Sequence, residues 1–210
     1  MMRSVALAAV VLLLGCSEGN GTGAVSGTLF VAQCHSDYGL GTPNAPVPFN
    51  LNPGYFLGIP EDDQQHLDQM NRLVIRVQST GNQLEEADVL YINIADVTPI
   101  GQALGQPIPV GPSTNLRATL SLVLTCPQIN TQLELDGQIV FSQFGHPPPP
   151  GQTQYIEFGD VMAATFEFDI VDRRALTLGG QGAVSSVPQA GGQLSGFFNF
   201  PVVQGPAQRL

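Results

Sequence analysis

Apolar and polar residues alternate with a period of two in five segments of the chain, which are residues 72–77, 89–94, 117–124, 133–141 and 165–170. Successive side chains of a strand point to opposite faces, so this alternation predicts strands with one face in a core and one in water. One-sided strands are typical of antiparallel sheets, because buried parallel strands are apolar throughout. The residues predicted to face inward include Ala118, Leu120, Leu122, Leu124, Leu133, Leu135, Ile139, Phe141, Phe166, Phe168 and Ile170.

Three segments share a Ser-Gly or Asp-Gly step ahead of an aromatic strand: VSGTLFVA from Val25, LDGQIVFS from Leu135 and LSGFFNFP from Leu194. A glycine inside a strand often marks a bulge or a close approach of two backbones. The segments begin 110 and 59 residues apart, and these unequal spacings indicate recurring strand chemistry rather than a repeated unit.

Helix is predicted only in short pieces. Residues 60–70 begin with Pro and three acidic residues, which suit the first turn of a helix, and a second turn is expected near residues 96–104. The chain holds 24 Gly and 17 Pro, which favours many turns between short strands. Residues 25–210 are therefore predicted to form a single all-β domain, an antiparallel β-sandwich of jelly-roll or immunoglobulin-like type with one short helix.

The N-terminus carries an uncharged apolar run over residues 5–14, directly after Arg3. A helix that spans a membrane needs about 20 apolar residues, so this run is too short to cross one. A short basic start, an apolar segment and then small residues are typical of a secretory signal peptide. Residues 1–15 are predicted to be such a signal, and a buried core strand is the alternative.

The residues Leu13-Leu14-Gly15-Cys16 resemble the lipobox that ends the signal peptides of bacterial lipoproteins. The resemblance covers residues 1–16 and implies that Cys16 is lipidated and becomes the first mature residue. Ser17 after the cysteine resembles the outer-membrane version, which implies a lipoprotein of the bacterial cell envelope that faces the periplasm or the surface. Residues 16–24 would then form the lipid anchor and a flexible, Gly-rich tether.

Two further cysteines, Cys34 and Cys126, remain if Cys16 is lipidated. An exported chain meets an oxidising compartment, so these two residues are predicted to form a disulfide. Two separate buried thiols are the alternative.

The formal net charge is −10, and all seven basic residues are Arg. This acidic balance argues against nucleic acid as a partner. The expected partners are the membrane, through the lipid anchor, and an envelope protein or a saccharide.

No catalytic residue is predicted, because the usual nucleophile, zinc, calcium and phosphate-loop motifs are absent from the sequence. At helical spacing Asp62, Asp63 and His66 could share a face and hold a divalent ion, but the favoured explanation is that the acids stabilise a helix start and that His66 is solvated. Glu157 and Asp160 beside Tyr155 could act as a pair of carboxylates in acid–base chemistry on a sugar, but ordinary alternation in an edge strand is the favoured explanation. The absence of Trp from the chain also argues against a sugar-binding platform.

The sequence thus favours a lipid-anchored envelope protein that acts as a non-catalytic binding or structural module without a cofactor. The alternative is a small secreted hydrolase or metal-dependent enzyme, so enzymatic activity stays an open question.

Overall fold

The computed structural model describes residues 20–34, 39–42, 44–61, 72–79, 87–127, 132–146, 156, 159–171 and 189–202. Nearly all regular structure in these residues is strand. The strands are β1 (Thr22–Val31), β2 (Val47–Leu51), β3 (Tyr55–Glu61), β4 (Arg72–Gln78), β5 (Asp88–Ile94), β6 (Pro107–Val110), β7 (Leu116–Leu122), β8 (Leu133–Phe144), β9 (Val161–Ile170) and β10 (Ala190–Pro201). The helical elements among them are α2 (Thr98–Gln102) and the single 3₁₀ turn η1 (Ala32–Cys34).

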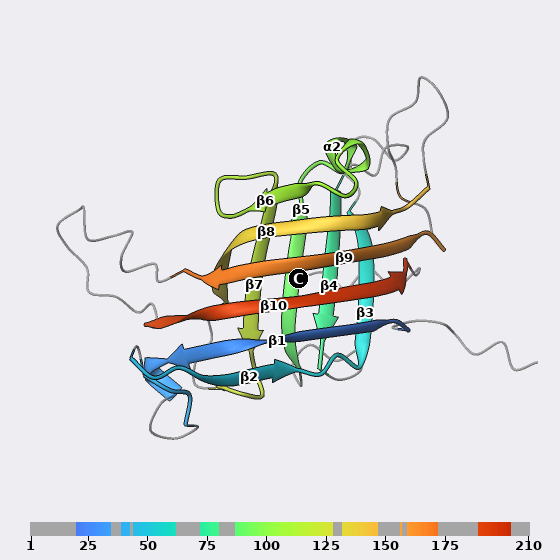
Figure 1. Ribbon diagram of the computed structural model, residues 1–210. Coiled ribbons are helices and arrows are strands. Elements are labelled where there is room, and N and C mark those ends of the chain that lie inside the picture. Colours follow the sequence, from blue (N-terminus) through green and yellow to red (C-terminus); the bar gives the residue numbers. More distant parts are fainter. Residues whose placement is uncertain are drawn as a thin grey trace, which may run out of the picture.

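All ten strands belong to one sheet, in the order β2-β1-β10-β9-β8-β6-β7-β5-β4-β3. Neighbouring strands pair antiparallel, except that β6 meets β7 in parallel at a single position. Figure 1 shows that β2, β1, β10, β9 and β8 form a front layer, and that β7, β5, β4 and β3 run across behind it. The prediction of an all-β, mostly antiparallel fold is confirmed, but the chain forms one curled sheet in place of two separate sheets.

The sheet turns from one layer into the other at β8. The first residues of β8 pair with β7 at Leu120↔Leu133 and Ala118↔Leu135, whereas its later residues pair with β6 from Gly137 onward. Gly137 has a φ of +149°, a backbone conformation that favours glycine. Along one edge β8 therefore pairs with both β7 and β6, while its other edge pairs with β9. This change of partner lets the two halves of a single sheet face each other.

The core lies between the two layers. The alternation predicted for β8 and β9 is confirmed, since Leu133, Leu135, Ile139, Phe141, Phe166, Phe168 and Ile170 are all buried. Aromatic rings link the layers: Phe56 of β3 stacks on Phe200 of β10 with 5.8 Å between ring centroids. A fully buried Phe side chain contributes about 1.5–3 kcal/mol of hydrophobic free energy, so these rings carry much of the stability.

Leu124 is the exception among the residues predicted to face inward. It is 50% exposed, because β7 ends at Leu122 and the chain enters a turn. The carboxylate of Asp88 fixes this turn by accepting hydrogen bonds from the backbone N–H of Leu124 (2.8 Å) and of Thr125 (3.1 Å), and from the Thr125 hydroxyl. A side chain distant in sequence therefore ends the strand, which the local pattern could not reveal.

Strands β4 and β5 are buried on both faces, not on one as their alternation suggested. From Leu73 to Gln78 every residue of β4 is buried. On the face of these strands that points away from the main core, a second cluster consists of Val74, Ala87, Val89 and Tyr91.

The predicted helix over residues 60–70 is wrong at its start. Pro60 and Glu61 lie in β3, where they pair with Leu73 and Arg72 of β4. β3 is an edge strand of the sheet, and an edge tolerates Pro because no neighbour requires its missing N–H. Residues 62–70 lie outside the described residues. The second predicted turn, near residues 96–104, is confirmed as α2.

The sheet also begins earlier than predicted, because Thr22, Gly23 and Ala24 of the expected tether belong to β1. A Cβ at Gly21 would lie 2.7 Å from atoms of both Phe56 and Phe200, and one at Gly23 would lie 2.8 Å from the Phe56 ring. The glycines of this segment thus allow the backbone to approach the aromatic core closely.

A disulfide joins Cys34 and Cys126, the pair that the sequence favours, with 5.8 Å between the two Cα atoms. It connects η1, which follows β1 of the front layer, to the turn after β7 of the rear layer. In the part of the chain that the structure describes, no helix is long and apolar enough to span a membrane.

Candidate functional site

Most site residues suggested by the sequence fall outside the described residues. These are Cys16, Asp62, Asp63, His66 and Glu157. Among the described residues, no three His, Cys, Asp or Glu side chains gather in a group that could hold a metal ion. The proposed metal ligands on residues 62–66 therefore remain a prediction, and the candidate sites below come from other parts of the fold.

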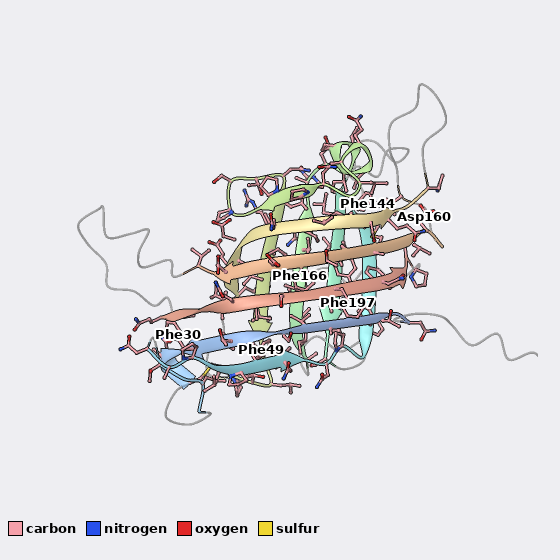
Figure 2. The ribbon with its side chains drawn as sticks, viewed as in Figure 1. Phe30, Phe49, Phe144, Asp160, Phe166 and Phe197 are labelled. Carbon is pink, nitrogen blue, oxygen red and sulfur yellow. A yellow bond between two sulfur atoms is a disulfide. The ribbon has the colours of Figure 1, made fainter. Side chains whose placement is uncertain are left out.

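His146 and Asp160 form a pair at the end of the front layer. The Nδ1 atom of His146 lies 2.8 Å from Oδ1 of Asp160, and the two side chains are 39% and 12% exposed. His146 follows β8 and Asp160 precedes β9, so the antiparallel pairing of these strands brings both residues together. Figure 2 labels Asp160 at this end of the front layer. Such a pair can orient an imidazole as a general base. It can equally close the base of the β8–β9 connection, where Gly145 N–H also donates to Val161 O at 3.1 Å.

Arg76 is buried on β4 in an unusual environment. Only 2% of the residue is exposed, its Nη2 donates to Gln78 Oε1 at 2.6 Å, and its Nε has no hydrogen-bond partner. Burial lowers the pKa of Arg76, although the nearby phenols of Tyr91 and Tyr55 act in the opposite direction. Burial likewise raises the pKa of Tyr91, and the Arg76 charge partly offsets this. The sequence pattern gave no signal for a buried arginine, since Arg76 alternates like a solvent-facing residue.

The outward face of the front layer carries polar side chains in rows. Directly opposite residues of an antiparallel pair point to the same side, so the register aligns Thr28, Gln193 and Asp169 in a first row across β1, β10 and β9. A second row, two residues further along each strand, holds Ser195, Glu167 and Gln138. Between the rows lies an open hollow of about 640 Å³, which we call the polar hollow; its side-chain walls are Thr28, Gln138, Glu167, Asp169, Gln193 and Ser195.

Glycines form the two ends of the floor of the polar hollow. Gly27 of β1 and Gly137 of β8 lie between the two rows. A Cβ at Gly27 would collide with the carbonyl oxygen of Gln193, and one at Gly137 with that of Glu167. The predicted close backbone approach at the Ser-Gly and Asp-Gly steps is therefore confirmed at these two positions.

A second hollow of about 440 Å³ adjoins the first and shares the row of Ser195, Glu167 and Gln138. We call it the aromatic hollow, because Phe197 of β10 lines it and is 46% exposed. Figure 2 labels Phe197 on β10 within the front layer. Phe198, the next residue, is buried, so Phe197 points away from the core and offers its ring to solvent.

Both hollows are acidic. Glu167 and Asp169 contribute carboxylates, and the lining residues that the structure describes include no Arg or His. Asp136 stands directly opposite Asp169 on the neighbouring strand, which adds a further negative charge nearby. The Gln193 side-chain amide donates to Asp169 Oδ1 at 2.9 Å and fixes one carboxylate in place. This face therefore disfavours anionic ligands and offers hydrogen-bond donors and acceptors to neutral or cationic ones.

Comparison of the chain with known protein families, with curated proteins and with solved structures gives no match, so its function is argued from its own geometry. Sequence reasoning located the strands of this face but not the hollows. The outward residues of one strand are visible in the sequence, whereas their alignment with those of β1, β8 and β10 depends on the register of pairing.

Proposed function

We propose that the protein is a lipid-anchored, non-catalytic binding module of the bacterial cell envelope, a sandwich-like domain that binds its partner on the outward face of β1, β10, β9 and β8. One observation carries the binding role. The polar and aromatic hollows form a continuous open surface of hydroxyl, amide and carboxylate groups beside an exposed Phe ring. An open surface admits water, whereas active sites usually exclude it, so this face suits the recognition of a partner better than catalysis.

The lipobox-like residues at Cys16 support the anchor, and they support an outer-membrane location through Ser17. Two or three acyl chains hold a protein on a bilayer far more firmly than one, since each buried methylene contributes about 0.8 kcal/mol. Residues 17–21 separate Cys16 from the start of β1 at Thr22, so the anchor would keep the domain close to the lipid surface.

Metabolic labelling with a radioactive fatty acid tests the anchor. The wild-type protein should take up label, and Cys16→Ser should take up none while its domain stays folded. Equal labelling of the two proteins would contradict the lipidation.

Photo-crosslinking in intact cells tests the binding face. A benzophenone-bearing amino acid at Ser195, between the two hollows, should yield specific adducts. The matched control is the same residue at Arg117, which is exposed on β7 in the rear layer. Adducts of equal yield and pattern from both positions would show that the front face has no special role.

A small secreted hydrolase is the second candidate, and the His146–Asp160 pair is the observation that favours it. His146→Ala, with Ser142→Ala near the end of the preceding strand β8 as control, separates the two functions. A hydrolytic activity that is lost only in His146→Ala would replace the binding proposal by the enzymatic one.

A further inference from the structure

We infer that the ligand of this face is a neutral oligosaccharide strand, which lies along the polar hollow and stacks a sugar ring on Phe197. The inference rests on the proposed binding function and names its ligand class. It depends on the chemistry of the two hollows, on their dimensions and on their charge.

The walls of the polar hollow match the hydroxyl groups of a sugar. Thr28 and Ser195 carry hydroxyls that both donate and accept hydrogen bonds, and Gln138 and Gln193 carry amides that do the same. Glu167 and Asp169 add acceptors of charge-assisted hydrogen bonds, which are shorter and stronger than neutral ones. Four of the six wall residues are thus uncharged and suit a ligand whose groups both donate and accept.

Phe197 supplies the apolar part of the site. The C–H groups on one face of a sugar ring present a weakly positive, apolar surface, and the face of an aromatic ring is negative. The Phe197 ring is 46% exposed and lies in the same hollow as Val140, so covering this part of the face with a sugar ring removes apolar surface from water.

The dimensions fit a chain of several sugars better than a single ring. The polar hollow extends over β1, β10, β9 and β8, and three steps between neighbouring strands of about 4.8 Å give a length of about 14 Å. The two rows are two residues apart along each strand, and each residue of a strand rises about 3.3 Å, so the rows are about 6.6 Å apart. The aromatic hollow adjoins the polar hollow along the row of Ser195 and Glu167.

The charge of the face selects among saccharides. Glu167 and Asp169 repel uronic acids, sialic acids and phosphorylated glycans, and the described part of the lining holds no Arg or His that would neutralise the two carboxylates. A basic peptide is the competing ligand for an acidic face. Its binding would depend mainly on the two carboxylates and would weaken as salt is added, whereas the binding of a neutral sugar would be insensitive to salt.

Affinity electrophoresis of the mature protein tests the inference. Soluble dextran, mannan and galactan cast into native gels serve as neutral probes, and polygalacturonate serves as the anionic control. At least one neutral polysaccharide should retard the wild type, and polygalacturonate should not. Phe197→Ala and Gln193→Ala should each weaken the retardation about tenfold. Asn199→Ala is the matched control, since Asn199 is exposed on the same strand, two residues from Phe197, and lines neither hollow.

Two results would overturn the inference. One is the absence of retardation by every neutral probe, and the other is an equal loss in Asn199→Ala and Phe197→Ala. Oligolysine is titrated in parallel by calorimetry. If oligolysine binds in a salt-dependent manner and none of the sugars binds, the face recognises a basic peptide. The proposed function fails by a different result, namely equal crosslinking from Ser195 and Arg117 in cells.

Discussion

On β9, consecutive residues face opposite environments. Phe168 is 2% exposed and stacks on Phe166 with 4.8 Å between the ring centroids, whereas Glu167 and Asp169 point outward into the polar hollow. Each of these side chains therefore belongs either to the core or to the outward face, but not to both. The two roles can be separated by substitution within three adjacent positions.

Phe168→Asp should unfold the domain. Truncating a buried Phe costs about 3–5 kcal/mol, and an unpaired buried carboxylate adds a desolvation cost, against a typical domain stability of about 5–15 kcal/mol. Glu167→Ala and Asp169→Ala should melt like the wild type, because both side chains are exposed. Thermal melting followed by circular dichroism checks this. If Glu167→Ala or Asp169→Ala melted at a lower temperature than Phe168→Asp, the carboxylates and not Phe168 would face the core, and the assignment would be wrong.

Arg76→Met should leave the stability unchanged or raise it. The lowered pKa of Arg76 reflects a fold that disfavours its charge, and a buried donor without a partner costs about 1–3 kcal/mol. Methionine keeps most of the volume without the charge. Arg117→Met, at an exposed position of β7, is the control for the loss of one positive charge. If Arg76→Met melts well below this control, the guanidinium stabilises the fold, and the account of this residue is wrong.

At the scale of the elements, the backbone of the front layer depends on glycines where strands approach closely. Gly27 of β1 lies opposite Leu194 of β10, and Gly137 of β8 lies opposite Phe168 of β9. Both glycines lie in the floor of the polar hollow, and Gly137 also lies where β8 changes its partner from β7 to β6. The geometry of the outward face therefore depends on residues without side chains.

Gly27→Ala should destabilise the domain by about 1–3 kcal/mol, the usual cost of overpacking, because the new Cβ would collide with the Gln193 carbonyl oxygen. Ser26→Ala, one residue earlier and exposed, should have little effect. Chemical denaturation of both variants measures the difference. Equal stability of Gly27→Ala and the wild type would contradict the close approach.

Much of the sheet could be predicted from the sequence, since alternation is a local property and marks β7, β8 and β9 well. The curl of the sheet was not predictable in this way, because it depends on β8 pairing with two partners. Pro60 and the acids after it carry the same local signals as a helix start, yet Pro60 lies in an edge strand. The pairing of His146 with Asp160 likewise required the register of β8 and β9 to be known.

At the scale of the molecule, two features hold the front and rear layers together. The aromatic contact between Phe56 and Phe200 joins them through the core, and the disulfide between Cys34 and Cys126 joins them covalently. The two cysteines are 92 residues apart in sequence, so the bridge closes a long loop. It restricts the unfolded chain much more than the folded one.

Cys126→Ser should lower the free energy of unfolding by about 4–5 kcal/mol, the chain-entropy value for a loop of this size. A reducing agent should lower the melting temperature of the wild type but not that of the variant. Peptide mapping without reduction should recover the two cysteine segments linked, and quantitative alkylation of both thiols before reduction would exclude the bridge.

We propose that the outward face of β1, β10, β9 and β8 binds the partner of this protein, so a partner should cover this face in the cell. Carbodiimide-driven labelling of carboxylates, quantified by mass spectrometry, tests it most directly when intact envelopes are compared with the purified protein. Asp96 is the reference, because it is exposed before α2 and far in sequence from this face. Glu167 and Asp169 should label strongly in the purified protein and weakly in the envelope, while Asp96 should label equally in both. Equal labelling of all three residues in the two preparations would show that nothing occupies the face and would contradict the claim.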